Sequence, residues 1–356
     1  MTRVLRVDPD RPDRHAIEDA ARELARGRLV AFPTETVYGL GAHALDARAV
    51  ARLFQAKGRP ATDPVIVHIA DANLLSSLAE DIPRTAYELA RRFWPGPLTL
   101  ILHKRASVPD AITAGRQTVG VRVPSHAIAQ SLLQEAEVPV AAPSANRFAQ
   151  PSPTTAAHVL ADLDGLIDLV VDGGPSPLGI ESTIVDLTVT PPVVRRPGGV
   201  TIEAIRDAIP DIETWSARQG VTVPQPAPGQ FRRHYAPRSP LTLYVGEPDA
   251  ITQRIAADAR AAVASGSRVG ILAPEDDLRA LAPRLAAVAT AGRIATRPYG
   301  SRGDPMAAAR NLFAALRDLD QAGVDLIFAS APDQRGIGAA VVDRLTRAAD
   351  GRVIYV

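Results

Sequence analysis

Short apolar runs alternate with amphipathic segments along residues 1–213. Such runs are typical of buried strands, whereas apolar residues spaced three and four apart indicate helices with one buried face. Since these elements alternate without a regular strand–helix–strand rhythm, we expect an open twisted mixed sheet with flanking helices. The predicted strands are 29–32, 65–67, 98–102, 119–123, 138–142, 169–172, 183–187 and 193–196. The predicted helices are 15–26, 47–55, 74–78, 85–93, 128–135 and 158–163.

After residue 240 predicted strands and helices alternate regularly, which predicts a smaller, Rossmann-like, doubly wound α/β domain. Its predicted strands are 241–245, 269–272, 293–296 and 326–329, with helices between them and after the last, including 306–319 and 338–349. Between the two patterns lies a connection containing proline, glutamine and glycine. We therefore expect one domain at 1–213, a linker at 214–240 and a second domain at 241–356.

Composition excludes several function classes. A net charge of +1 and an aromatic content of 4% argue against bulk electrostatic coating of nucleic acid, although a local basic cleft stays possible. The absence of cysteine excludes disulfides, thiolate metal sites and a cysteine nucleophile. The N-terminus has no apolar signal region and no apolar run approaches membrane-spanning length, so we expect a cytoplasmic protein without membrane association.

Lysine is rare in this chain. Of 40 basic residues only Lys57 and Lys104 are lysine, so 40 − 2 = 38 are arginine. A lysine retained at position 57 is consistent with a need for a compact ammonium group, but a cation is also mildly favourable at a helix end. Together with Arg59, Arg122 and Arg196, which lie beside turns bearing Ser, Thr or Asn, Lys57 could neutralise the charge of a polyphosphate.

Standard phosphate-loop and dinucleotide-binding motifs are missing. The Gly336-Ile337-Gly338 stretch lacks a third glycine and is interpreted as a turn with close helix packing. Ser144 and Asn146 end an apolar strand, where ligands of open α/β sheets usually bind, although both residue types also favour turns.

Histidine and carboxylate residues offer little for a metal. His68 ends a predicted strand and would lie beside the Thr34 turn if the two strands pair. No cluster of His, Asp and Glu has metal-ligand spacing, so we predict no metal held by the protein. If ATP is a substrate, the expected cofactor is Mg²⁺ that arrives with it and is bound largely by phosphate oxygens and water.

Four short motifs occur in order: PTETVYGLG at 33–41, KGRP at 57–60 with a strand ending in histidine after it, PSAN at 143–146, and PGQFRRHYAP at 228–237. The first three resemble the YrdC-like family of threonylcarbamoyl-AMP synthases. The fourth is similar to the linker of that family's long, two-domain form. The resemblance implies a YrdC-like catalytic domain followed by a linker that forms a flap over the active site.

The resemblance also implies a reaction. ATP, L-threonine and bicarbonate would yield threonylcarbamoyl-AMP and pyrophosphate, a nucleotidyl transfer, and the product would pass to the machinery that modifies an adenosine in tRNA. Direct tRNA binding stays open. Matched by motif, the residues implied around L-threonine are Thr34, His68, Arg122, Ala142 and Ser182, with Arg122 facing the carboxylate. Those implied around ATP are Lys57, Asp63, Thr118, Ser144, Ser152, Arg196 and Tyr235. Lys57, Arg59, Ser144 and Asn146 form the implied catalytic set, and Asp63 falls where the family often has Asn.

Two other functions stay open at this point. An RNA-binding module without catalysis would need a basic stripe with exposed aromatic residues. A different carbamoyl transferase built on the same domain would be expected to carry additional metal or acylphosphatase-like modules. Residues 241–356 contain neither cysteine nor histidine, and their role cannot be derived from the sequence.

Overall fold

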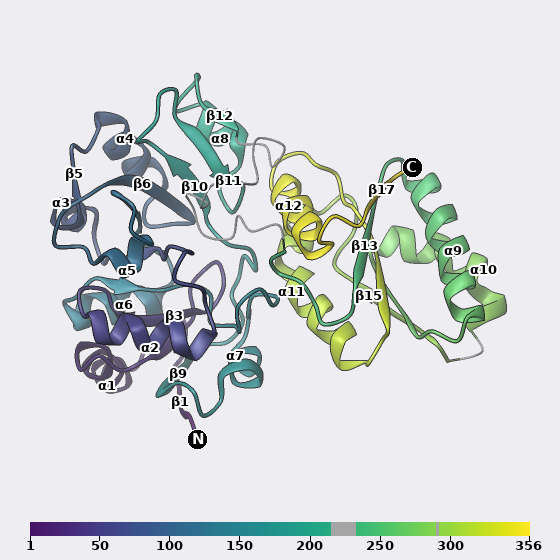
Figure 1. Cartoon of the computed structure of the whole chain (residues 1–356), viewed down its shortest axis with the longest axis horizontal. Helices are drawn as coiled ribbons and strands as arrows, with labels where there is room; N and C mark the ends of the chain where they lie inside the picture. Colours follow the sequence, from purple (N-terminus) through teal and green to yellow (C-terminus); the bar gives the residue numbers. More distant parts are fainter. Residues whose placement is uncertain (215–232, 290–291) are drawn as a thin grey trace. The chain divides into compact units, whose positions relative to one another are not determined.

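The computed structural model describes residues 1–214, 233–289 and 292–356 (Figure 1). The described chain divides into two compact units. The first contains residues 1–148 and 152–214, and the second contains residues 149–151 and 233–356. Most of the predicted linker, residues 215–232, lies outside the described residues. The predicted domain boundaries and the flap therefore stay predictions.

The first unit is built on a mixed sheet, which confirms the predicted fold class. β10 runs parallel to β6 but antiparallel to β11. Within the described residues the order is β1 (Arg3–Arg6), β9 (Leu169–Asp172), β2 (Val30–Phe32), β3 (Gly39–His43), β8 (Val140–Ala141), β4 (Val67–His68), β7 (Thr118–Arg122), β6 (Leu98–Lys104), β10 (Thr183–Asp186), β11 (Val193–Arg196) and β12 (Glu213–Thr214), and β5 (Ala79–Glu80) pairs with β6.

Helices cover both faces of the part of the sheet that contains β2. Val30 and Phe32 enter one hydrophobic core with residues of α1 (Arg14–Ala25) and α6 (Ala127–Ala136). Leu29 and Ala31 enter another core, shared with α2 (Ala47–Lys57) and α7 (Ala156–Leu163). Successive side chains of a strand point to opposite faces, so a continuous apolar run is what a strand covered on both faces requires.

The part of the sheet that contains β6 is covered differently on its two faces. Leu98, Leu100 and Leu102 enter the largest core with α3 (Leu75–Leu78) and α4 (Arg84–Phe93). The alternate residues Thr99 and Ile101 lie on the other face, and Ile101 belongs to a separate small cluster. We call this second face the site face. The remaining short helices of this unit are η1 (Ala72–Leu74), α5 (Asp110–Thr113) and α8 (Ile202–Arg206).

Two features of this sheet were not predicted. Gly39 and Gly41 lie within β3, a strand that is missing from the sequence prediction. A Cβ atom on Gly41 would lie 2.9 Å from a ring carbon of Phe32, so the glycine allows close packing. In addition, β3 and β8 lie between β2 and β4, so the strands that carry the Thr34 turn and His68 do not pair with each other.

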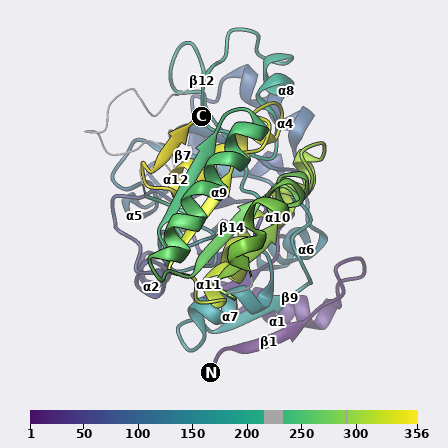
Figure 2. The same ribbon diagram turned by 90° about the vertical axis from the view of Figure 1, so that its right-hand side faces the viewer.

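The second unit contains a parallel sheet with helices on both faces, as predicted (Figures 1 and 2). Helices α9 (Pro248–Ala264) and α10 (Glu275–Ala289) pack together on one face, and α11 (Pro305–Gln321) and α12 (Gly338–Ala348) on the other. The strand order is β15 (Ile294–Pro298), β14 (Val269–Ala273), β16 (Leu326–Ser330), β13 (Leu241–Val245) and β17 (Val353–Tyr355). None of the helices described in either unit is long and apolar enough to cross a membrane.

Candidate functional site

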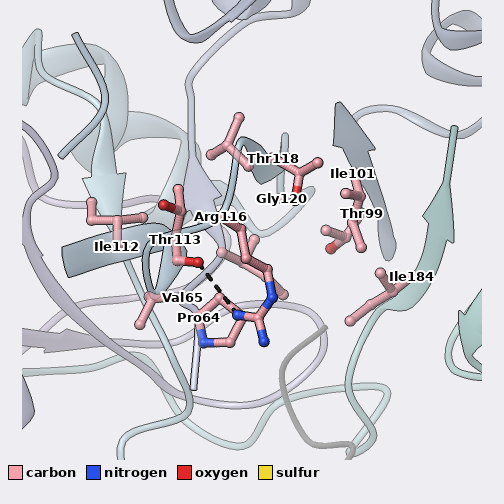
Figure 3. A pocket seen from close by; sticks show the side chains of 12 residues that line it. Pro64, Val65, Thr99, Ile101, Ile112, Thr113, Arg116, Thr118, Gly120 and Ile184 are labelled. Atoms are coloured by element: carbon pink, nitrogen blue, oxygen red, sulfur yellow. Dashed lines mark hydrogen bonds between the residues drawn. The ribbon is translucent and has the colours of Figure 1, made fainter. Parts of the chain in front are cut away.

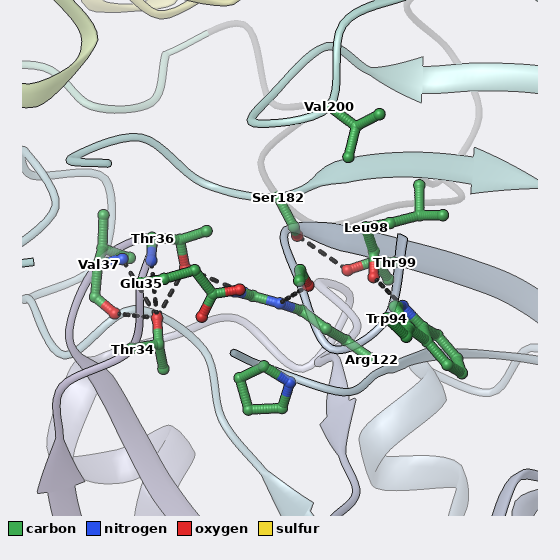
Figure 4. A network of polar contacts seen from close by, with 12 residues as sticks. Thr34, Glu35, Thr36, Val37, Trp94, Leu98, Thr99, Arg122, Ser182 and Val200 are labelled. Atoms are coloured by element: carbon green, nitrogen blue, oxygen red, sulfur yellow. Dashed lines mark hydrogen bonds and ion pairs between the residues drawn. The ribbon is translucent and has the colours of Figure 1, made fainter. Parts of the chain in front are cut away.

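Arg122, at the end of β7, organises one polar group in the first unit (Figure 4). Its Nη1 donates to Thr36 Oγ1 at 3.0 Å, and its Nη2 lies 2.6 Å from Glu35 Oε1. Thr36 Oγ1 lies 2.7 Å from Thr34 Oγ1, so Thr34 reaches Arg122 through Thr36 rather than directly. The guanidinium is buried. It is a forked donor suited to a planar carboxylate, and here Glu35 supplies that carboxylate.

His68 is the register partner of Arg122 between the parallel strands β4 and β7. Burial, and next the charge of Arg122, lower the pKa of its imidazole to about 3. Its Nδ1 atom has no hydrogen-bond partner within the described part of the chain. The ring is therefore neutral at neutral pH and can contact a ligand without carrying charge. The backbone N–H of Ala142 donates to Ile66 O at 3.0 Å, which places Ala142 next to the same strand.

Lys57 fixes the PSAN loop to the end of α2. Its Nζ donates to the backbone oxygens of Ser144 and Asn146, each at 2.5 Å. Gly58, in the left-handed conformation with φ 63°, ends the helix at this point. Burial and then the charge of Arg59 lower the Lys57 pKa well below its usual value. A compact ammonium can approach two carbonyls at once, which is a structural reason for lysine at this position.

Asp63 lies at the centre of a second polar group, and its side chain is completely buried. Arg59 Nη2 lies 2.8 Å from its carboxylate and also donates to Pro64 O at 2.6 Å. Burial raises the Asp63 pKa, against the opposing charges of Arg59, Lys57, Arg196 and Arg116. Several basic groups therefore surround one carboxylate, which leaves the surroundings attractive to an anion.

Ser182 links Arg196 to the site face. Arg196 Nη2 donates to Ser182 O at 2.9 Å and to Ser182 Oγ at 3.2 Å, and that hydroxyl lies 2.8 Å from Thr99 Oγ1. The pairing of β10 with β6 creates this contact. Ser152 Oγ donates to Glu181 Oε1 at 2.5 Å, so Ser152 is held by a buried carboxylate.

The structure buries most of the predicted residues of the first unit. Thr118 and Ser144 are half-buried. The buried ones are Thr34, Lys57, Arg59, Asp63, His68, Arg122, Ala142, Asn146, Ser152, Ser182 and Arg196. Hydrogen bonds join Thr34 to Arg122 by way of Thr36, Lys57 to the PSAN loop, and Ser182 to Arg196. The side-chain amide of Asn146 donates locally, to Arg147 O at 2.6 Å.

Tyr235 belongs to the second unit. Its ring is buried, 5.5 Å from the Phe313 ring, with the Arg344 guanidinium carbon 5.1 Å from its centroid. Its backbone is in the left-handed region, with φ 59°. Its predicted contact with the nucleotide stays a prediction.

Sequence reasoning missed Glu35, Thr36, Thr99 and Glu181 as members of these groups. One signal was available for Glu35, which is the only charged residue between Phe32 and Gly41. The others contact predicted residues through strand register or loop packing, which the sequence does not display. No group of three or more His, Cys, Asp or Glu side chains that could hold a metal ion occurs among the residues described.

Comparison with known proteins identifies the family. Residues 22–198 match the family model described as telomere recombination, and residues 200–350 match the threonylcarbamoyl-AMP synthase C-terminal domain. A threonylcarbamoyl-AMP synthase of Pyrococcus abyssi is 44% identical, and the alignment covers 100% of both chains. The chain belongs to the threonylcarbamoyl-AMP synthase family.

Further relatives support the same assignment. The threonylcarbamoyl-AMP synthase of Bacillus subtilis is 42% identical, with 95% of this chain and 94% of the relative covered. The crystal structure of P. abyssi Sua5 complexed with L-threonine superposes with a TM-score of 0.91 at 42% identity over 100% of both chains. Membership in this enzyme family favours an enzyme over the RNA-binding module considered above.

Proposed function

We propose that this chain synthesises threonylcarbamoyl-AMP and pyrophosphate from ATP, L-threonine and bicarbonate. One observation supports this most strongly: the first unit contains two separate groups of buried basic side chains, each beside a carboxylate. The Arg122 group suits a carboxylate, and the basic groups around Asp63 suit a polyphosphate. A site for an amino acid and a nucleoside triphosphate needs both.

L-threonine would bind at the Arg122 group. The P. abyssi relative was crystallised with L-threonine, and Arg122 here already holds a carboxylate, that of Glu35. The amino-acid carboxylate would replace or share this contact. Thr34 and the neutral His68 would complete the surroundings, because both are buried and can exchange hydrogen bonds without adding charge.

ATP would bind through Lys57, Arg59 and Arg196. Burial lowers the Lys57 pKa, and an incoming phosphate would reverse that effect by favouring the charged ammonium. Mg²⁺ would enter with ATP and supply further neutralisation of phosphate charge. Asp63 fits such an ion, because its carboxylate offers hard oxygens and Oδ1 has no hydrogen-bond partner in the described residues.

The reaction needs no protein nucleophile. The threonine amine and bicarbonate form a carbamate with loss of water, the carbamate oxygen attacks the α-phosphorus of ATP, and pyrophosphate leaves. The chain would contribute positioning of the two substrates and neutralisation of developing charge. The burial of both groups supports a water-poor site, which an unstable carbamate requires. The product is an activated carbamoyl donor, which we expect a tRNA-modifying transferase to consume.

Pyrophosphate release tests this proposal. The protein is mixed with ATP, Mg²⁺ and bicarbonate, and each amino acid is added in turn. We expect release that requires both L-threonine and bicarbonate and is lost in Lys57→Ala. Lys104→Ala is the matched control, because Lys104 is the other lysine and its Nζ contacts Asp110 at 2.8 Å, and neither residue belongs to the groups described above. Release without amino-acid dependence, or none from folded protein, would refute the proposal, and the latter result would favour RNA binding.

A further inference from the structure

Glu35 is a buried carboxylate beside Arg122, and the proposed reaction has so far given it no task. The residues implied around L-threonine include one permanent cation and no acidic side chain: Thr34, His68, Arg122, Ala142 and Ser182. An amino acid at neutral pH carries an ammonium group as well as a carboxylate. An ammonium taken out of water needs acceptors or a counter-charge, so the second charge of the substrate has no partner in that set.

The Glu35 carboxylate is poorly satisfied where it lies. Its Oε1 is 2.6 Å from Arg122 Nη2, but this contact is an ion pair without hydrogen-bond geometry, because neither Oε1 nor Oε2 has a hydrogen-bond partner in the described part of the chain. The side chain is only 11% exposed, so little water can reach it. Buried acceptors without donors cost free energy, and a ligand that brings N–H groups would remove this cost.

The backbone of Glu35 is fixed, although its carboxylate is not. Glu35 O accepts from Leu178 N at 2.9 Å, and Thr34 Oγ1 accepts from the backbone N–H groups of Thr36 and Val37 at 3.2 and 3.3 Å. In Figure 4 the carboxylate points from this turn toward the guanidinium. Rotation about the side-chain bonds can therefore move the carboxylate to a second partner while the turn stays in place.

The other buried carboxylates described in the first unit each have a partner elsewhere. Their side chains form the pairs Asp63 with Arg59, Glu181 with Ser152 and Asp186 with Arg195. A cavity on the site face is lined by Thr99 and Ile101, and none of the described residues that line it is acidic (Figure 3). Among the described residues, Glu35 is therefore the buried acidic side chain placed to meet an amino acid whose carboxylate binds Arg122.

Carbamate formation requires a proton acceptor at the substrate nitrogen. An ammonium nitrogen has no lone pair, so it must lose a proton before it can bond to carbon. R–NH₃⁺ and HCO₃⁻ give R–NH–COO⁻ and water: the C–N bond forms, the C–OH bond of bicarbonate breaks, one amine proton leaves in the water, and a second needs a base. His68 is unsuited to this task, because burial and the charge of Arg122 oppose its protonation and lower its pKa to about 3.

We propose, on the basis of the proposed function, that Glu35 binds the α-ammonium of L-threonine and accepts this second proton. The substrate carboxylate takes over the guanidinium of Arg122, and the Glu35 carboxylate turns to the ammonium beside it. Glu35 then becomes a neutral carboxylic acid as the C–N bond forms, and it returns its proton to solvent when the product leaves. In the empty site the same carboxylate neutralises the buried Arg122.

Calorimetric titration of the full chain with L-threonine and with an analogue that lacks the ammonium tests the contact. The analogue is 2,3-dihydroxybutanoate of the same configuration, which keeps the carboxylate and side chain but has a hydroxyl group in place of the ammonium. In Glu35→Gln the affinity for L-threonine should fall about tenfold or more, whereas the affinity for the analogue should not fall. Retained binding of the analogue also shows that the Arg122 group is intact in the variant.

Pyrophosphate release at saturating L-threonine tests the proton transfer. Glu35→Gln should slow release about a hundredfold, because glutamine cannot accept a proton. Glu88→Gln is the matched control, because the Glu88 side chain is exposed and pairs with Arg84 at 3.2 Å. This control should bind both ligands and turn over as wild type does.

Three results would overturn the assignment. Unchanged L-threonine affinity in Glu35→Gln would exclude the ammonium contact. Equal losses for L-threonine and the analogue would show that Glu35 only supports Arg122. An unchanged rate at saturating L-threonine would exclude the proton transfer. Any of these results with an active wild-type chain would overturn this inference alone, whereas absence of threonine-dependent release from wild type would overturn it together with the proposed function.

Discussion

Acidification should destabilise the first unit through His68. In the unfolded chain this imidazole takes up a proton as the pH falls through 6.5, but in the folded chain its pKa is about 3 because of burial and Arg122. The folded state therefore excludes a proton that the unfolded state binds. The stability that neutral His68 contributes is fully present above pH 6.5 and is lost as the pH falls toward about 3.

The size of this effect follows from the two pKa values. Between the two pKa values, each unit by which the pH falls lowers the free energy of unfolding by about 1.4 kcal/mol, because one additional proton is bound on unfolding. Lowering the pH from about 7 to about 5 should therefore reduce the free energy of unfolding by about 2 kcal/mol through His68 alone. The ring is only 3% exposed, so solvent screens little of this difference.

Urea unfolding at both pH values, compared between wild type and His68→Gln, isolates this contribution. Glutamine does not titrate, so the variant should lose about 2 kcal/mol less than wild type on acidification, whatever its absolute stability. His15→Gln is the control, because the His15 side chain is 92% exposed, and this variant should respond to acid as wild type does. Equal acid losses in His68→Gln and wild type would refute the reasoning.

Two further predictions concern buried ion pairs. Arg122→Gln should raise the KM for L-threonine by about thirtyfold or more and leave the Kd for ATP unchanged, because it removes the guanidinium that would pair with the threonine carboxylate. Steady-state kinetics measure the KM and ATP titration measures the Kd. An equal effect on the two constants would contradict the assignment of Arg122 to L-threonine. Asp277→Asn should lower the unfolding free energy by about 3 kcal/mol, because the carboxylate pairs with Arg302 at 2.7 Å through both oxygens. Urea unfolding measures this loss. Asp333→Asn is the control, because it removes an exposed ion pair with Arg335 that should contribute little to stability. A loss in Asp277→Asn no larger than the loss in Asp333→Asn would contradict the prediction.

Elements with a strong apolar pattern could be predicted from the sequence. The strand at 98–102, the helix at 47–55 and the strands at 183–187 and 193–196 all occur, because burial on a fixed face imposes a period on the residues. The helix continues two residues further, to Lys57. β1 (Arg3–Arg6) could not be predicted in this way. It is a mostly exposed edge strand held by parallel pairing with β9, and such backbone pairing leaves little trace in side-chain type.

The sequence motifs predicted which residues belong to the candidate site, but not which contacts those residues make. The motifs supplied Lys57 and Arg122, but not the fact that Lys57 binds backbone carbonyls or that Glu35 holds Arg122. These contacts depend on how loops and strands distant in sequence come together.

Identification of the product formed with isotopically labelled bicarbonate tests the central claim most directly. The chain is incubated with ATP, Mg²⁺, L-threonine and ¹³C-bicarbonate, and the products are analysed by mass spectrometry. The account predicts an adduct that contains AMP, threonine and the labelled carbon, and that is absent when any one substrate is omitted or when Lys57 is replaced by alanine. Conversion of ATP without incorporation of the label into such an adduct would contradict it.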